Sequence, residues 1–290
     1  MDIFLRSIGL SNLDPSDVQD LIELTKDDSD KRRLIGTTKH KVHAEYYKSI
    51  GTGLGLTLSG TLDSEGEFTY ANLLPSMHSL TRIPVKTLRI KKIYDTPVVS
   101  YTNPYGNEIS FVLQNAVDYK YNSYKIARQY QNPDIVKTVR LGGLSLWGTI
   151  LLPINRENED APEDFFCKNI VIKNKDIDDF RKSIMTMYQK DSQNLIRERL
   201  KEDDLLSVVD SYFLPMEDDY VYSYDVLGRI ISVDTIINQH SGEDVYNLTI
   251  NAAGFVLNIY INKYDVLGFP MVGMRFMGNC KLQGHVSIEN

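Results

Sequence analysis

Cysteine is scarce in this chain of 290 residues, which contains only Cys167 and Cys280. Two cysteines so far apart do not form the disulfide framework of a small secreted domain, and they are typical of a reducing compartment. No stretch approaches the roughly 18 consecutive apolar residues of a membrane-spanning helix. The opening segment, MDIFLRSIGL, has too short an apolar run for a signal peptide. We therefore expect a cytoplasmic protein that does not associate with membranes.

Recognisable catalytic motifs are also missing. The chain has neither a Gly-x-Ser-x-Gly elbow nor a His-Glu-x-x-His pair. In GTGLGLTLSG, Gly55 and Gly60 have the spacing of a phosphate loop, but Thr61 occupies the position that such a loop gives to lysine. Cys167 lacks the surroundings of a known thiol nucleophile, so we expect it to be a buried apolar side chain. These absences favour a protein that is not an enzyme.

One pair of histidines invites a metal-site interpretation. His40 and His43 lie three residues apart, with Glu45 close by, and on a helix they could share one face. A structural metal site needs about four ligands, and no cysteine or further histidine at suitable spacing completes this set. We expect a surface pair here, with no metal site and no cofactor.

The composition is that of a folded globular protein, with 42% hydrophobic and 24% charged residues. Tyrosine is abundant, at 18 residues against 10 phenylalanines, which is typical of half-buried sheet surfaces. The net charge is −7, so the chain as a whole repels nucleic acids and anionic membranes.

Residues 1–217 predict the first of two domains of an α+β protein, a largely antiparallel sheet with flanking helices. MDIFLRSIGL predicts a strand, and a helix follows in which Asp14 caps the N-terminus, Pro15 takes the first position and Asp17 the first turn. The charged segment TKDDSDKRR is expected to be a mobile connection. Alternating segments between about residues 40 and 152 predict the sheet. Apolar spacing near 176–213 predicts one long helix or two shorter ones.

Residues 218–290 predict the second domain, a small OB-like β-barrel. Within it, apolar residues that share a face are expected to form the core: Tyr246, Leu248, Ile250, Phe255, Leu257, Ile259 and Ile261. The opposite face carries Asn247, Thr249, Asn258 and Tyr260, which are polar and uncharged. If this face binds a ligand, a peptide or a sugar would lie there; the alternative is a solvated outer sheet face.

A basic and aromatic run, YKYNSYKIARQY, is the best candidate for contact with nucleic acid. Lys120, Lys125 and Arg128 alternate with Tyr121 and Tyr124, and stacking rings with cations suit single strands. The C-terminal segment opposes this interpretation, because from residue 218 onward it has four Lys and Arg against eight Asp and Glu. Such a barrel is a poor partner for a polyanion, so nucleic acid is a disfavoured alternative.

The pentapeptide YDVLG occurs twice, at residues 224–228 and 264–268, in surroundings that do not align. The first copy continues an extended strand, with Gly228 at a bend. The second follows a strand end, where Asp265 can cap one short turn and Gly268 can end it. We expect no duplicated module here, and two conformations for the same five residues.

Several stretches together carry a family resemblance: FLRSIGLSNL, EYYKSIGTGLGLTLSG, FVLQNAVDY, LGGLSLWGTILLP, GEDVYNLTI and YDVLGFPMVGMRFMGNCKLQG. Over its whole length the chain resembles a family of uncharacterised bacterial proteins, mostly from clostridial gut lineages, known as a domain of unknown function. The resemblance implies a bacterial cytoplasmic protein and implies no mechanism.

Three functions remain open on the sequence. The favoured one is a non-enzymatic cytoplasmic binding or scaffold protein, whose partner is another protein or a peptide or sugar ligand. The second is an enzyme with an unrecognised active site in the N-terminal domain, which would show as a deep pocket lined by carboxylates or histidines. The third is a single-stranded nucleic-acid binder.

Overall fold

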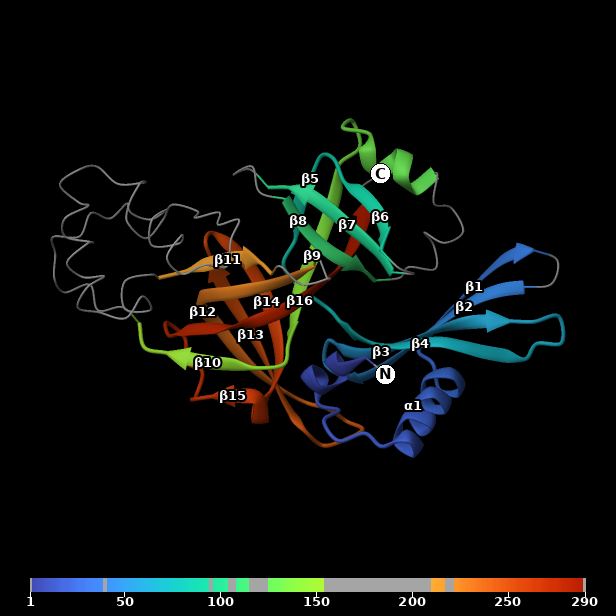
Figure 1. Ribbon diagram of the computed structural model, residues 1–290, viewed down its shortest axis with the longest axis horizontal. Helices are drawn as coiled ribbons and strands as arrows, with labels where there is room; N and C mark the ends of the chain where they lie inside the picture. Colours follow the sequence, from blue (N-terminus) through green and yellow to red (C-terminus); the bar gives the residue numbers. More distant parts are fainter. Residues whose placement is uncertain are drawn as a thin grey trace, which may run out of the picture.

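The described part of the chain is mostly β-sheet, arranged as two sheets with few helices (Figure 1). The computed structural model describes residues 2–38, 41–93, 96–103, 108–114, 125–153, 210–216 and 222–288. The prediction of largely antiparallel pairing is confirmed. The helix predicted near 176–213 lies outside the described residues except at its end, where the prediction was wrong because Tyr212 and Phe213 begin a strand. The helical share of the α+β prediction therefore rests on short elements.

Two short helices begin the chain. The first, η1 (Ile3–Ile8), is a 3-10 helix, so the strand predicted for MDIFLRSIGL was wrong. The side chain of Asp2 accepts a hydrogen bond from the Phe4 amide, and Gly9, at a φ of +84°, ends the helix. The second, α1 (Pro15–Asp27), confirms its prediction, because Asp14 and Asp17 form a reciprocal capping box at its start.

The first sheet is a four-stranded antiparallel meander. Its strands follow chain order: β1 (Lys31–Thr38), β2 (Lys41–Gly51), β3 (Leu54–Leu62) and β4 (Phe68–Met77). The segment TKDDSDKRR is therefore not wholly a mobile connection, since its last three residues begin β1. One face of this sheet packs against both helices through a shared core that includes Leu5, Ile8, Leu21, Ile22, Tyr46, Leu56 and Leu58.

The second sheet takes strands from the middle and from the C-terminal part of the chain, in the order β11-β12-β13-β14-β9-β16-β8-β7-β6. These and the attached short strands are β5 (Ile83–Val85), β6 (Arg89–Ile93), β7 (Thr96–Thr102), β8 (Glu108–Leu113), β9 (Lys137–Ser145), β10 (Gly148–Leu151), β11 (Tyr212–Pro215), β12 (Ser223–Ile237), β13 (Asp244–Ala252), β14 (Phe255–Asn262), β15 (Val266–Leu267) and β16 (Arg275–Ile288). Strand β9 lies between β14 and β16, parallel to the first and antiparallel to the second. The expected domain boundary after residue 217 thus falls between segments whose strands share one sheet.

Five strands of this sheet follow one another in a ring of pairings. β12 pairs with β13, β13 with β14, β14 with β9 and β9 with β16, while β16 also pairs with β12. β12 pairs with both strands through different parts of its length: residues 223–229 pair with β16 and residues 229–237 pair with β13. Gly228 sits at the change of partner, where an added Cβ would lie 2.8 Å from the Asn251 carbonyl oxygen.

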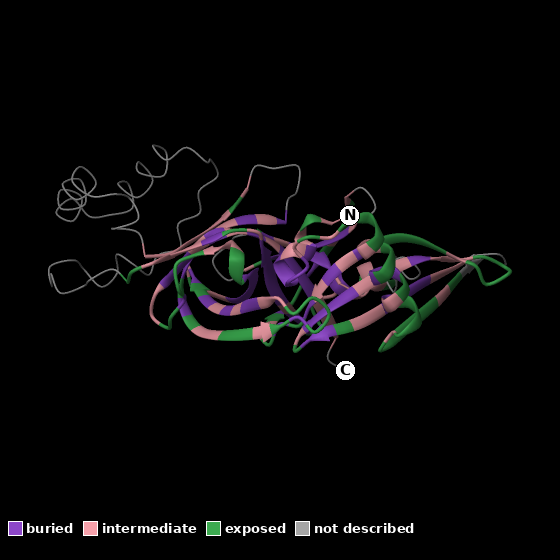
Figure 2. Cartoon of the chain, turned by 90° about the horizontal axis from the view of Figure 1, so that it is seen from below, coloured by how far each residue is buried: buried purple, intermediate pink, exposed green. Residues whose placement is uncertain are grey.

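The predicted alternation of β13 and β14 is confirmed. Leu248, Ile250, Leu257, Ile259 and Ile261 are fully buried in the main core, which lies in the middle of the described structure (Figure 2). Tyr246 belongs to the same core, and Phe255 packs against it from a partly buried position. Burial of this face stabilises the sheet mainly by removing apolar surface from water.

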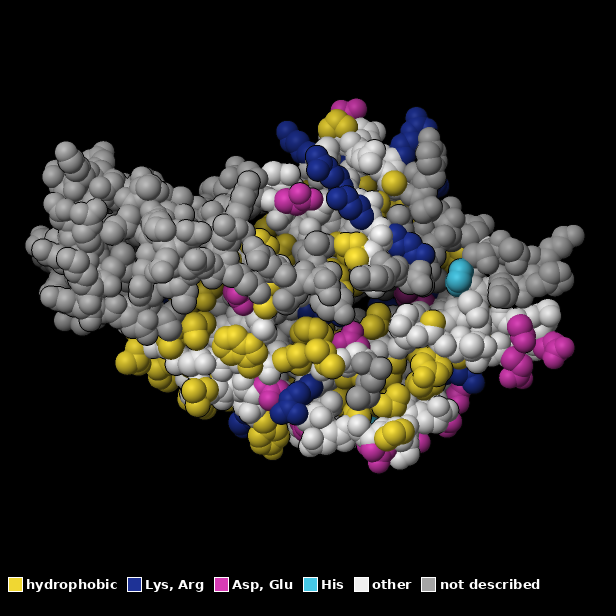
Figure 3. Space-filling view, viewed as in Figure 1, with side chains coloured by type: hydrophobic (Ala, Val, Ile, Leu, Met, Phe, Trp, Pro, Cys, Tyr) yellow, Lys and Arg dark blue, Asp and Glu magenta, His cyan; other side chains and the backbone are white. Residues whose placement is uncertain are grey.

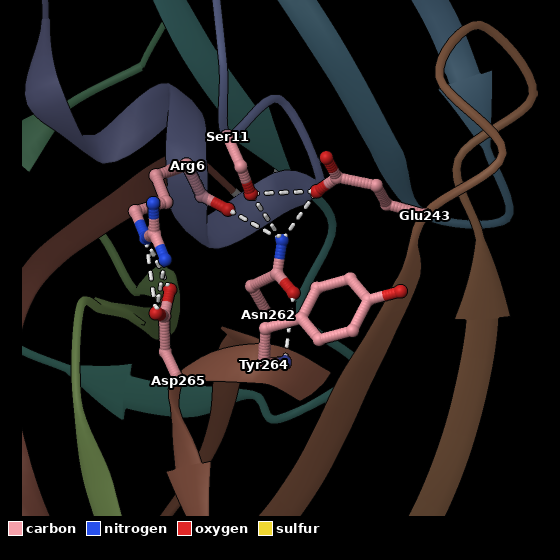
Figure 4. A network of polar contacts seen from close by, with 6 residues as sticks. All are labelled: Arg6, Ser11, Glu243, Asn262, Tyr264 and Asp265. Carbon is pink, nitrogen blue, oxygen red and sulfur yellow. Dashed lines mark hydrogen bonds and ion pairs between the residues drawn. The ribbon is translucent and has the colours of Figure 1, made fainter.

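An ion pair connects the second YDVLG copy to η1. Asp265 ends the 3-10 helix η3 (Lys263–Asp265) and pairs with Arg6, whose Nε and Nη2 both donate to the carboxylate (Figure 4). The cap of η3 is Asn262, which accepts from the Tyr264 amide, so the prediction that Asp265 caps this turn was wrong.

Candidate ligand-binding pocket

A pocket of about 280 Å³ lies between the two sheets. Each sheet provides part of its wall, and the segment that follows β4 provides the rest. Its lining residues are Lys31, Arg33, Glu45, Tyr47, Ser76, Met77, His78, Ser79, Gln114, Arg140, Gly142 and His285.

Strands β1 and β2 supply one wall. Alternate residues of a strand point to the same side, so Lys31 and Arg33 share a face. In the antiparallel register they lie opposite Tyr47 and Glu45, respectively. The Lys31 ammonium sits 5.7 Å from the centre of the Tyr47 ring, a cation–π distance. Burial raises the pKa of the Tyr47 phenol, so this ring stays neutral beside the lysine.

Strands β9 and β16 supply the facing wall. Arg140 and His285 lie directly opposite each other in the antiparallel register. The Arg140 Nε atom is buried and has no hydrogen-bond partner among the described residues. A buried donor without a partner costs about 1–3 kcal/mol. An acceptor brought by a ligand would recover that free energy.

At Gly142, on the floor of the pocket, there is no room for a larger side chain. A Cβ added at Gly142 would lie 2.5 Å from the Met77 Cε and 3.2 Å from the Asn258 carbonyl oxygen. Gln114 completes this side by donating to Gln283, the residue opposite Gly142.

The residues predicted as a ligand face lie directly behind this pocket. Asn258 and Tyr260 are buried, at 4% and 1% exposure, so this face is covered rather than solvated. The Asn258 side chain accepts from the Ser79 hydroxyl at 3.0 Å, and the Tyr260 hydroxyl donates to the His78 carbonyl at 2.8 Å. Burial raises the pKa of Tyr260 to about 12, which keeps that hydroxyl a donor. Both residues therefore position the lining segment after β4.

Asn247 and Thr249 support the same arrangement from β13. The Asn258 amide donates to the Asn247 side chain at 3.0 Å and to the Thr249 hydroxyl at 3.1 Å. The structure thus brings together all four residues of the predicted face, in contact with groups of the chain itself. Direct binding of a peptide or sugar by these four side chains stays a prediction.

The nucleic-acid candidates are only partly described. Lys125 and Arg128 are exposed on a helical segment, residues 125–131, while Lys120, Tyr121 and Tyr124 lie outside the described residues. Figure 3 shows Lys and Arg side chains gathered over the part of the molecule where β5 to β7 lie. Their role in binding nucleic acid stays a prediction.

The described ranges contain no group of three or more His, Cys, Asp and Glu residues arranged to hold a metal ion. They also contain no helix both long and apolar enough to cross a membrane. Of the predicted histidine pair, His43 lies on β2, and His40 falls outside the described residues.

Comparison with known proteins identifies the family. Residues 5–284 match the family model described as "Domain of unknown function, E. rectale Gene description (DUF3881)". The chain belongs to this family. The resemblance to an uncharacterised clostridial family is thereby confirmed. No curated protein and no solved structure matches the chain, so DUF3881 membership brings no activity with it.

The pocket could hardly be predicted from the sequence. Lys31 and Arg33 were hidden in a segment that looked like a charged connection, and Arg140 and His285 each lie alone in an apolar strand. The one usable signal was the alternation of Lys31 and Arg33 across a single intervening residue, which matches the period of a strand.

Proposed function

We propose that the chain is a non-enzymatic binding protein whose pocket between the two sheets takes an anionic small molecule. The observation that carries the proposal is the charge of the lining. Three cationic side chains, Lys31, Arg33 and Arg140, meet there with a single carboxylate, Glu45, in a chain whose net charge is −7.

Electrostatics explain why such a pocket selects a small anion. An acidic surface repels large polyanions, but a concave wall of low dielectric focuses the field of the cations inside it. Arginine also presents a planar fork of donors that matches carboxylate and phosphate oxygens. A small anion therefore fits this pocket better than an extended nucleic acid does.

We further propose that the ring formed by β12, β13, β14, β9 and β16 is an OB-like barrel, and that the protein works in the cytoplasm. The barrel proposal is supported by five successive pairings and by the register shift of β12 between Ile230 and Ser232, close to where this strand changes partner. In contrast to the expectation from residues 218–290 alone, β9 would be the fifth strand. The cytoplasmic proposal is supported by the low cysteine content and by Cys280, which is a buried free thiol.

Calorimetric titration tests the binding function. Inorganic phosphate, citrate and succinate are titrated into the purified protein, with neutral glycerol as the reference. We expect at least one anion to bind and glycerol not to bind. In the double variant Arg33→Gln/Arg140→Gln, the affinity for that anion should fall by about tenfold or more, a change of at least about 1.4 kcal/mol.

The matched control removes the same two charges elsewhere. Lys125→Gln/Arg128→Gln neutralises two exposed side chains that do not line the pocket. Its affinity should stay within about twofold of that of the unmodified protein. Equal losses in both double variants, or no binding of any anion, would contradict the proposal.

One observation supports an enzyme as the alternative. Glu45 is buried, at 6% exposure, and shares the pocket with His78 and His285. A carboxylate and imidazoles are the side chains that most often move protons in catalysis. If a bound anion is slowly converted, and the conversion stops in Glu45→Gln while binding persists, the enzyme alternative would replace the binding function.

A further inference from the structure

We infer that the anionic group of the ligand is the dianion of a phosphate monoester, held between the two sheets by Lys31 and Arg33 on one side and Arg140 on the other. The inference rests on the proposed binding function and narrows it to one class of ligand. It also predicts what binding does to the first sheet.

The first argument is the balance of charge. The three cations and the Glu45 carboxylate leave the pocket at two positive charges when the histidines are neutral. A phosphate monoester carries about 1.5 to 2 negative charges at pH 7, whereas a single carboxylate carries one. The monoester matches the lining, and a monocarboxylate leaves a positive charge uncompensated.

The second argument is the number of acceptor oxygens. Arg140 and Arg33 belong to different sheets, so one ligand group must offer oxygens in two directions to meet both. A carboxylate has two oxygens in one plane, and a single arginine fork takes both. A phosphate monoester has three terminal oxygens around a tetrahedral centre. It can accept from the Arg140 Nε, which has no partner among the described groups, and still face β1.

The third argument concerns the rest of the ligand. The Tyr47 ring and the Met77 thioether offer apolar surface, while Ser76 and Gln114 offer hydrogen bonds. The volume, about 280 Å³, lies just below the range for small-molecule sites, which begins near 300 Å³. We therefore infer a compact ester with a short polar body.

Such a ligand would join the two sheets. Within the described part of the chain, β1 pairs with one neighbour, β2, and lies at the edge of the first sheet. Lys31 and Arg33 are exposed on it. A phosphate bound by these two residues and by Arg140 would connect β1 to β9. Amide hydrogen exchange in β1 should therefore slow when the ligand is present.

The test uses glycerol 3-phosphate as the probe, on the full chain, by calorimetric titration. We expect it to bind at least about tenfold more tightly than succinate and than inorganic phosphate, and glycerol not to bind. Arg140→Lys should weaken glycerol 3-phosphate binding by about tenfold, because an ammonium cannot replace the arginine fork. Arg128→Lys, on the exposed helical segment, should leave it unchanged.

Each other outcome overturns a defined part of the inference. If succinate binds as tightly as glycerol 3-phosphate, the ligand is not specifically a phosphate, although the proposed anion binding still holds. If inorganic phosphate binds as tightly as glycerol 3-phosphate, the inference of an ester is wrong. If no anion binds, the proposed function fails as well. Should Arg140→Lys fail to fold, as judged by circular dichroism, Lys31→Gln replaces it, and unchanged affinity in that variant would place the anion elsewhere.

Discussion

The two copies of YDVLG place the same five residues in opposite surroundings. In β12, Tyr224, Val226 and Leu227 are buried, at 1%, 0% and 0% exposure. In the second copy, Tyr264 and Leu267 are 79% and 73% exposed. The first copy is wholly extended, whereas the second begins in the 3-10 helix η3 and ends in β15. The predicted difference in conformation is thus confirmed.

The difference shows that neighbouring strands, not local propensity, decide how this pentapeptide folds. Residues 224–227 pair with β11 on one side and β16 on the other, so both edges of the strand are occupied. Among the strands that the structure describes, residues 266–267 pair with β10 alone, through two positions. Strand preference is known to depend on such packing more than on the residue itself.

The largest expected effect comes from removing the upstream strands that serve both copies. A fragment of residues 218–290 lacks β11 and β10, and it lacks β9 between β14 and β16. We expect this fragment to show no cooperative unfolding in urea, because its core loses one wall and the strand edges that pair with β9, β10 and β11 become unpaired. A sigmoidal urea transition monitored by circular dichroism would show instead that residues 218–290 form an independent domain.

The next largest effect separates the two tyrosines. The Tyr224 ring stacks on Phe213 at 4.5 Å, and its hydroxyl accepts from the Ser110 amide at 2.7 Å. Tyr224→Ala should lower the free energy of unfolding by about 3–5 kcal/mol, as expected for a buried aromatic side chain. Tyr264→Ala should change it by less than about 0.5 kcal/mol. Urea denaturation of both variants measures the difference, and similar losses would mean that the exposed tyrosine packs against something in solution.

The two glycines should respond differently to the same pair of substitutions. An added Cβ at Gly228 would meet Asn251 and Ala252, so Gly228→Ala should cost about 1–3 kcal/mol and Gly228→Asn more. Gly268 has a φ of +97°, a conformation that asparagine tolerates better than alanine. Gly268→Asn should therefore cost less than Gly268→Ala. Thermal unfolding of the four variants tests this reversal of order, and the same order at both sites would refute it.

The smallest effect concerns the aspartate of the second copy. Asp265 accepts from Arg6 at 2.6 and 2.7 Å, with its side chain only 9% exposed. Asp265→Asn should cost about 1 kcal/mol, since the pair is charged and hydrogen bonded but the arginine is partly solvated. Asp244→Asn is the control, because the Asp244–Lys263 pair is more exposed and should contribute less to stability than the Asp265–Arg6 pair. If urea denaturation shows equal losses of unfolding free energy in the two variants, the Arg6–Asp265 pair contributes no more to stability than an exposed ion pair does.

Local patterns in the sequence were enough to predict some elements. The alternation of apolar and polar residues along β13 and β14 identified Leu248 and Ile259 as core residues. In a strand with one apolar face, this pattern specifies which side chains point into the core. The start of α1 was equally clear, since Asp14, Pro15 and Asp17 act within one turn of the chain. Each of these features depends on residues that are close together in the sequence.

Features that depend on contacts between residues far apart in the sequence could not be predicted from local patterns. Nothing near Gly142 indicates that it pairs with Asn258, and so the insertion of β9 was not foreseen. The pocket was missed for the same reason, because Arg140 meets Lys31 only once the two sheets have packed. The polar residues of β14 were noticed, but the segment after β4 that covers them was not predicted to lie there.

The insertion of β9 also has a consequence for synthesis on the ribosome. When residues 137–145 emerge, β5 is available to pair with residues 137–139, but neither β14 nor β16 has yet been made. The backbone N–H and C=O groups of β9 that pair with β14 and β16 must wait for both strands, and long-range pairing of this kind folds slowly. An unpaired strand edge is prone to aggregate during such a delay. We expect the nascent chain to depend on chaperones until residue 288 has been translated.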